Sequence, residues 1–181
     1  MTTALVTIGD ELTTIQVIGS GEEGEPTDYR IPRGMVSLHR AHITADPPLP
    51  ENLTNAIGDM MDHLDDAVRA LTLLGSVTEV VVAGRAAEAI AAVEFGGEIT
   101  VETFELGRAA AEDVFRTLAT EPVDLRRRNP GLPAELGETI PAGCCALVAV
   151  LRSLHLDRVT VQLGADKAGP TTAGTTSAGP R

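Results

Sequence analysis

The chain has 181 residues, which fits one domain, and 43% of them are hydrophobic, as in an ordinary globular protein. Its net charge of −12, from 26 acidic and 14 basic residues, argues against non-specific binding to nucleic acids or to anionic lipid surfaces. Aromatic residues make up only 2%, so the core has to be built from aliphatic side chains. The first residues lack the pattern of a signal peptide, and no run of about 18 apolar residues is present, so the expected location is the cytoplasm.

The first half of the chain is predicted to form a hairpin, a third strand and a long helix. Residues 3–8 and 12–18 are short apolar runs joined by a tight turn, and residues 29–33 have the composition of a further strand. Apolar residues at spacings of three and four predict one amphipathic helix over residues 51–74, which Gly75 is expected to end. The apolar residues of this pattern are Leu53, Ile57, Met60, Leu64, Val68 and Leu71.

Strands and helices alternate in the second half of the chain. The predicted strands cover residues 78–84, 98–106 and 157–164, and the predicted helices cover residues 85–95, 107–120 and 138–156. The last helix is apolar nearly all round, which predicts that it is buried. Its two cysteines, Cys144 and Cys145, are expected to be small, reduced core residues.

This order of elements predicts an α/β fold with a mixed sheet, opening antiparallel strands and flanking helices. Residues 121–137 are predicted to be a connector that carries the one basic cluster of the chain, at positions 126–128. Residues 1–165 are expected to form the domain. Residues 166–181 consist mainly of Gly, Thr, Ala and Pro and are expected to be a disordered tail.

Several stretches, taken together in chain order, resemble the exopolyphosphatase / guanosine pentaphosphate phosphohydrolase (Ppx/GppA) family of the actin–sugar kinase–Hsp70 superfamily. They are "LVTIGDELTTIQVIG", "RGMVSLHRAHITADPP", "VVAGRAAEAIAA", "NPGLPAELGETIPAGCCAL" and "RVTVQLG", and they span about residues 3 to 165. Enzymes of that family have two lobes with the active site in the cleft between them. The resemblance implies that this chain is a single ribonuclease-H-like (actin-like ATPase) lobe, similar to the second lobe of the family.

The chain departs from the family where its second lobe carries a D-x-G-G-G-S phosphate loop. The positions that correspond to the loop are Thr7, Gly9, Asp10, Glu11 and Leu12. A phosphate loop works because glycines let consecutive backbone N–H groups close on an anion. Two carboxylates at this turn would repel a phosphate, so we expect the hairpin to be kept as a scaffold and the phosphate cradle to be lost.

Other candidate sites are weaker. The Thr of the family's A-G-T segment is replaced, so Gly84–Arg85 either attracts an anion at a helix start or is simply an exposed helix start. His39 and His42 lie three residues apart with Asp46 nearby, a spacing that a metal site shares with ordinary surface histidines, and no metal site is predicted. No catalytic residue is assigned.

The resemblance leaves three functions open. The leading expectation is a degenerate single lobe without phosphatase activity, which acts as an interaction or regulatory module and needs no cofactor. Its partner, a protein or a second copy, would cover the face left bare by the first lobe and the final helix of the family, which this sequence does not show. The first alternative is a half-enzyme completed in trans by a separate first lobe, which would then use Mg²⁺. The second alternative is a binding module for an anion or a nucleotide.

Overall fold

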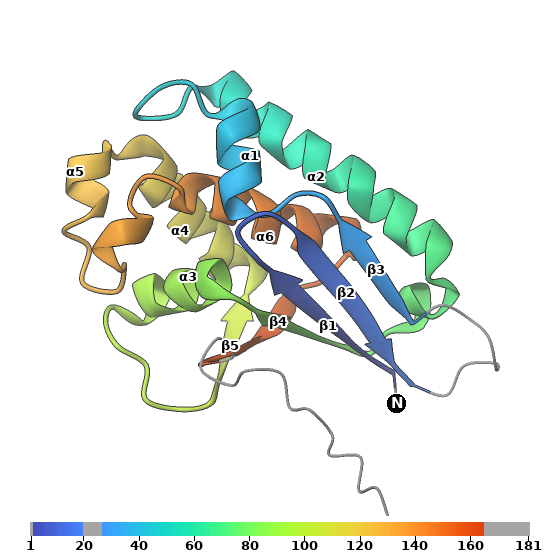
Figure 1. The fold of residues 1–181 in the computed structure, drawn as a ribbon. Helices are drawn as coiled ribbons and strands as arrows, with labels where there is room; N and C mark the ends of the chain where they lie inside the picture. The colour runs from blue at the N-terminus through green and yellow to red at the C-terminus, as the bar shows by residue number, and fades with distance from the viewer. Residues whose placement is uncertain (1, 20–26, 165–181) are drawn as a thin grey trace, which may run out of the picture.

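The computed structural model describes residues 2–19 and 27–164, and these form a six-stranded sheet with helices packed on it (Figure 1). The predicted tail over residues 166–181 lies outside the described residues. The strands are β1 (Thr3–Ile8), β2 (Thr13–Ile18), β3 (Asp28–Ile31), β4 (Glu79–Ala83), β5 (Thr103–Gly107) and β6 (Arg158–Gln162). Their order across the sheet is β3-β2-β1-β4-β6-β5.

The sheet is mixed, as the order of elements predicted. Strands β1, β4 and β6 run parallel to one another, whereas β2, β3 and β5 pair antiparallel with their neighbours. The opening hairpin has a regular register, with Thr3 opposite Ile18 and Ile8 opposite Thr13. Because β1, β4 and β6 are parallel, their carboxyl ends lie at one edge of the sheet, where ligand sites of open α/β sheets usually form.

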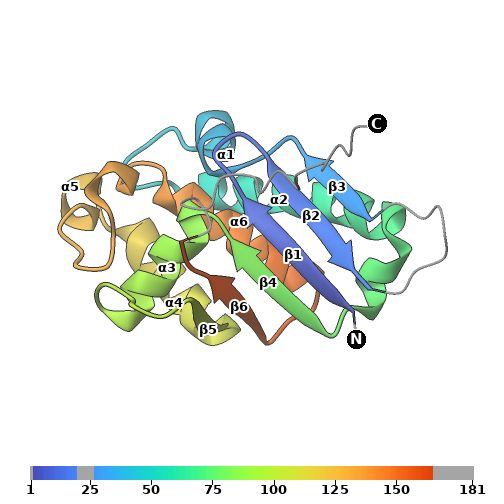
Figure 2. The ribbon, with the colours of Figure 1, turned by 60° about the horizontal axis from the view of Figure 1, so that its bottom comes forward.

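The helices cover one face of the sheet. They are α1 (Met35–His42), α2 (Pro50–Ala70), α3 (Arg85–Phe95), α4 (Arg108–Thr120), α5 (Val123–Arg126) and α6 (Ile140–Ser153). Figure 2 shows β2, β1, β4 and β6 in front of α2 and α6. Strand residues alternate accordingly: Val6, Ile15 and Val82 are buried, whereas Leu5 and Val81 on the other face are only half-buried.

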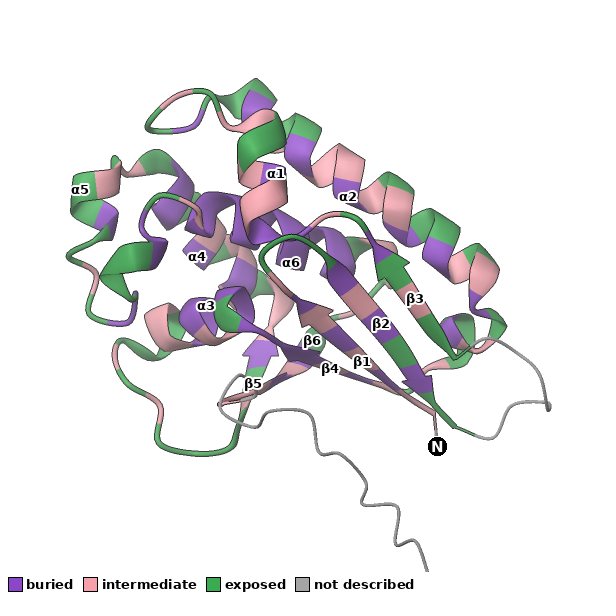
Figure 3. Cartoon of the chain, viewed as in Figure 1, coloured by how far each residue is buried: buried purple, intermediate pink, exposed green. Residues whose placement is uncertain are grey.

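Helix α6 is the centre of the core, and Figure 3 shows it buried along nearly its whole length. It packs against α1, α2 and α4, which explains why all its residues from Ile140 to Leu151 are buried. A Cβ atom at Gly143 would lie 2.9 Å from the Cβ of Ala86 and 3.1 Å from the sulfur of Met35. The small residues of α6 therefore let neighbouring helices approach closely, and the helix is buried as its composition predicted.

Helix α2 ends earlier than the helix predicted over residues 51–74. Helix α2 ends at Ala70, and a 3₁₀ helix over Thr72–Ser76 follows, so Gly75 does not end α2. Within α2 the buried positions are Asn52, Ala56, Met60, Leu64 and Ala67. Leu53, Ile57 and Val68, which the apolar pattern predicted to be buried, are only half-buried. The face of α2 that packs on the core is instead centred on positions that include Ala56 and Ala67.

Two further boundaries differ from the prediction. The strand predicted over residues 98–106 pairs with β6 only from Thr103 onward, and residues 98–102 form a loop. The predicted connector over residues 121–137 contains helix α5 and a 3₁₀ helix over Ala134–Leu136. None of the helices in the described part of the chain is long and apolar enough to cross a membrane.

Candidate functional site

The β1–β2 turn contains most of the residues that correspond to a phosphate loop. Gly9 donates its backbone N–H to the carbonyl oxygen of Leu12 at 3.0 Å, which closes the turn. Asp10 and Glu11 lie at its tip, with side chains 45% and 61% exposed. Thr7 lies one residue before the end of β1, opposite Thr14 of β2.

The turn caps the amino end of helix α1 with carbonyl oxygens. The N–H of Met35 donates to the carbonyl of Gly9 at 2.9 Å, and the N–H groups of Val36 and Ser37 donate to the carbonyl of Asp10 at 2.8 and 3.1 Å. A Cβ atom at Gly34 would lie only 2.3 Å from the carbonyl oxygen of Gly9, so this approach requires glycine. The amide donors that begin α1 are therefore already satisfied from within the chain.

Both carboxylates of the turn are ion-paired. Asp10 lies 3.4 Å from a terminal nitrogen of Arg85, and Glu11 lies 3.0 Å from a terminal nitrogen of Arg40. These pairs join the turn to the first residue of α3 and to α1. The charge of each carboxylate is partly offset by its arginine, and two guanidinium groups that would otherwise attract an anion already have acidic partners.

Gly84 and Arg85, the second candidate, lie beside the turn. Gly84 has a φ of 106°, and a Cβ atom there would lie 2.3 Å from the carbonyl oxygen of Ile8, so both the conformation and the contact require glycine. Arg85 begins α3, its side chain is 44% exposed, and its second terminal nitrogen lies 3.9 Å from Glu135. The structure thus places the two candidate sites next to each other at the carboxyl ends of β1 and β4.

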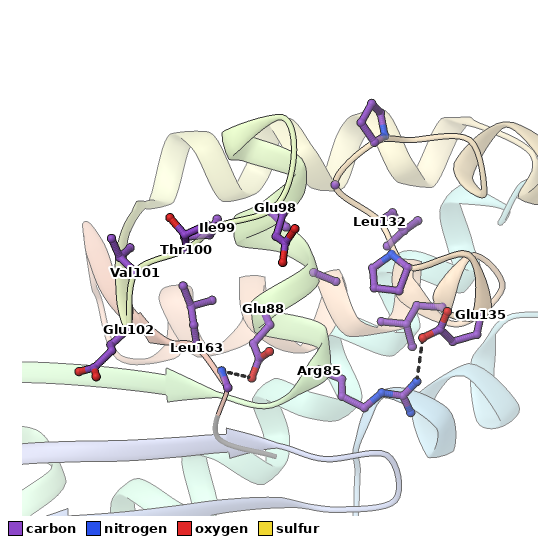
Figure 4. Close-up of a pocket in the computed structure, with 17 residues that line it drawn as sticks. Arg85, Glu88, Glu98, Ile99, Thr100, Val101, Glu102, Leu132, Glu135 and Leu163 are labelled. Atoms are coloured by element: carbon purple, nitrogen blue, oxygen red, sulfur yellow. Dashed lines mark hydrogen bonds and ion pairs between the residues drawn. The ribbon is translucent and has the colours of Figure 1, made fainter. Parts of the chain in front are cut away.

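A groove of about 610 Å³ adjoins Arg85 (Figure 4). It lies between α3, the loop over residues 98–102 and the segment over residues 130–136, and Leu163 and Gly164 close one end. Its charged residues are Arg85, Glu88, Glu98, Glu102 and Glu135. Sequence reasoning missed this groove, because residues 98–106 were assigned to a strand and residues 130–136 to a connector.

Two of the four histidines, His42 and His63, share one carboxylate. His42 and His63 contact the carboxylate of Asp59 at 2.7 and 3.4 Å, and the Nε atom of Arg33 lies 2.6 Å from the same group. Burial raises the pKa of Asp59, but the hydrogen bonds from Arg33 and His42 outweigh it and hold that pKa below its ordinary value. Among the described residues, no group of three His, Cys, Asp or Glu side chains is arranged to hold a metal ion.

His39 lies apart from the other histidines. Its Nε2 atom is 3.8 Å from Glu138, and its Nδ1 atom is buried without a hydrogen-bond partner in the described structure. Burial lowers the pKa of His39, Glu138 raises it, and Arg126 lowers it further, so the net direction is downward. His39 and His42 therefore do not converge on one point, and Asp46 is engaged elsewhere, with Arg126.

Arg126 is buried, although it belongs to the basic cluster predicted in the connector. Its side chain is 2% exposed and donates to the carbonyl oxygens of Gly137 at 2.6 Å, Leu118 at 3.2 Å and Glu121. Its remaining terminal nitrogen pairs with Asp46 at 2.6 Å. The role of Arg126 is therefore structural, since it joins α4, α5 and the start of α6 to the loop before α2.

The two cysteines are buried and unpaired, as predicted from their place in an apolar helix. Burial raises the pKa of both thiols, that of Cys145 to about 12. Neither thiol is ionised near neutral pH, so neither has the character of a nucleophile.

Comparison with known proteins gives matches among solved structures alone. No family model and no curated protein sequence matches the chain. A crystal structure of an exopolyphosphatase-like protein matches with a TM-score of 0.78 and 19% identity, over 88% of this chain and 55% of that one. The PPX-GPPA enzyme of Aquifex aeolicus matches with a TM-score of 0.77 and 20% identity, over 90% of this chain and 53% of that one. An exopolyphosphatase from Cytophaga hutchinsonii matches with a TM-score of 0.67 and 13% identity, over 88% of this chain and 52% of that one.

These matches concern the fold, and they cover most of this chain but only part of each structure. The chain spans about half the length of the solved structures it matches. Such coverage agrees with a single lobe of the Ppx/GppA fold, and the matches confirm the predicted α/β fold with a mixed sheet. The chain therefore has the fold of Ppx/GppA phosphatases over about half of their length.

Proposed function

We propose that this lobe is a phosphatase-fold module without phosphatase activity of its own, which acts through interaction with another protein. The observation that carries the proposal is the β1–β2 turn. At this turn Asp10 and Glu11 stand where a phosphate loop needs glycines, and both are paired with arginines of the same chain. The two arginines beside the turn already have acidic partners, so they are less available to an external phosphate.

The backbone supports the same proposal. A phosphate loop presents N–H groups to the anion, whereas this turn presents the carbonyl oxygens of Gly9 and Asp10 to the first amides of α1. Phosphoryl transfer depends on positioning and on positive charge from several sides at once. An anion that approached this turn would meet carboxylate oxygens at the tip and carbonyl oxygens behind them.

A second candidate is a half-enzyme that works with the remaining half of the fold. It is favoured by the fact that the chain spans about half of the Ppx/GppA structures that it resembles. A separate first lobe, acting in trans, would supply the groups that position the attacking water. Mg²⁺ would then be the expected cofactor.

The test is an assay of phosphate release from long-chain polyphosphate and from guanosine pentaphosphate in the presence of Mg²⁺. We expect no turnover by the chain as given, because the turn cannot stabilise the charge of the transferred group. A turnover above about 1 s⁻¹, in the range of working enzymes, would refute the proposal. Activity that appears only after a matching first lobe is added would support the half-enzyme instead.

A further inference from the structure

The groove beside α3 is lined by apolar residues, and further apolar side chains are exposed next to it. Ala89, Leu132 and Leu136 line it and are nearly fully buried. Val101, on its outer side, is 58% exposed, and Phe95, one turn beyond the lining residue Ala92, is 60% exposed. Exposed apolar side chains that adjoin a groove are typical of surfaces that contact a partner.

Phe95 is held in this exposed position. Its ring makes an edge-to-face contact with Phe104 of β5, with the ring centres 6.3 Å apart. Phe104 is half-buried and packs against the core, so it anchors the exposed ring of Phe95. A fixed aromatic ring gives contact area at a low cost in side-chain entropy, which suits an interface.

The rim of the groove is acidic. Figure 4 shows Glu88 bonded to the backbone N–H of Gly164 and Glu135 paired with Arg85, and these contacts measure 3.1 and 3.9 Å. Glu98 and Glu102 are exposed, and among the described residues their carboxylates form no hydrogen bond or ion pair. The groove thus has four carboxylates and one guanidinium, and that guanidinium is shared with Asp10 of the turn.

We propose that this groove docks a basic segment of a partner protein, in which lysine or arginine side chains stand next to an aliphatic anchor. This inference rests on the proposed interaction function and names the chemistry of the partner. The aliphatic part of a basic side chain would lie along Ala89 and Leu132, and its charged head would reach Glu98 and Glu102. The aliphatic anchor would pack on Phe95.

A peptide fits this surface better than a small cation does. The groove volume of about 610 Å³ is typical of a ligand site, but the exposed side chain of Phe95 extends the apolar surface beyond the groove, next to the exposed lining residue Val101. An extended segment can cover both parts together. Complementary charge would also speed the encounter, because a chain of net charge −12 attracts basic partners at long range.

The experiment uses a fluorescein-labelled peptide of alternating leucine and lysine, and a matched peptide with glutamate in place of lysine. The basic peptide should bind the full chain and should shift the amide resonances of Ala92, Val101 and Leu163. The double variant Glu98→Lys/Glu102→Lys should bind it about tenfold more weakly or worse, since two attractive charges become repulsive. The acidic peptide should not bind.

The control is Asp62→Lys/Asp65→Lys, which changes the net charge equally on the exposed side of α2. If this control weakens binding as much as the groove variant does, the attraction is only general electrostatics and the inference is wrong. Phe95→Ala, with an unchanged melting temperature, should also weaken binding, and no loss of affinity would refute the apolar half of the argument. Phosphate release by the unmodified chain is measured separately, so failure of docking and failure of the proposed function are distinguishable.

Discussion

Neutralising the turn tests whether its carboxylates exclude phosphate. In the double variant Asp10→Asn/Glu11→Gln the side chains keep their size and lose their charge. The cap on α1 should persist, because it uses the backbone carbonyls of Gly9 and Asp10. Arg85 and Arg40 would lose their partners at the turn and become available to an external anion.

The expected magnitudes follow from the distances and the exposure. Each ion pair is about half-exposed and should contribute only about 0.2–1 kcal/mol to stability, so the variant should lose less than about 2 kcal/mol. A carboxylate about 4 Å from a bound anion repels it by ~1 kcal/mol in water-like surroundings. Removing two carboxylates should therefore tighten the binding of pyrophosphate by roughly thirtyfold.

Isothermal titration of pyrophosphate at low salt measures this gain, and added salt should reduce it. The matched control is Asp66→Asn/Asp113→Asn, which removes two acidic partners of exposed arginines on α2 and α4. If the turn variant binds no more tightly than the control, the carboxylates are not what keeps phosphate from this turn.

Three further changes test the packing around the site. Gly84→Ala should destabilise the chain by about 1–3 kcal/mol because of its positive φ, whereas Gly58→Ala, with open space around it in α2, should be neutral or stabilising in the same urea titration. Arg126→Ala should lower the free energy of unfolding by about 3–5 kcal/mol, because it leaves buried carbonyl oxygens without a donor. If the loss is as small as that of the exposed control Arg128→Ala, Arg126 does not have this structural role. The thiol of Cys145, whose pKa is raised to about 12 by burial, should react with Ellman's reagent only after unfolding, and rapid labelling of the folded chain would show that α6 opens.

Sequence patterns predicted the elements well where burial on one side controls them. The hairpin, β4, α3 and α4 have nearly the predicted bounds, because a period of two or of three to four residues follows directly from packing one face. The end of α2 was wrong because the 3₁₀ helix after it is also apolar, with Leu74 buried, so the pattern continued past Ala70. The spacing of apolar residues therefore cannot distinguish the end of an α-helix from a 3₁₀ helix that directly follows it and also buries an apolar side chain.

Contacts between distant residues could not be predicted. The sequence identified Asp10, Glu11 and Arg85 as unusual, but not the ion pairs of the turn, whose partners lie 29 and 75 positions apart. Nothing local distinguishes Arg126 from the two arginines that follow it. Its buried guanidinium is bonded to nearby carbonyls and also pairs with Asp46, which is 80 positions away.

Arg85 connects the two surfaces on which the functional argument rests. Its guanidinium lies between Asp10 of the turn, at 3.4 Å, and Glu135 of the groove, at 3.9 Å. When Asp10 is neutral, Glu135 becomes the remaining acidic partner of Arg85, so the groove should be less acidic. The turn variant should therefore bind the basic peptide more weakly, by less than about fivefold for an exposed pair, while it binds pyrophosphate more tightly. Opposite changes in the two affinities would mean that one guanidinium divides its charge between both surfaces, and an unchanged affinity for the basic peptide would show that the two surfaces act independently.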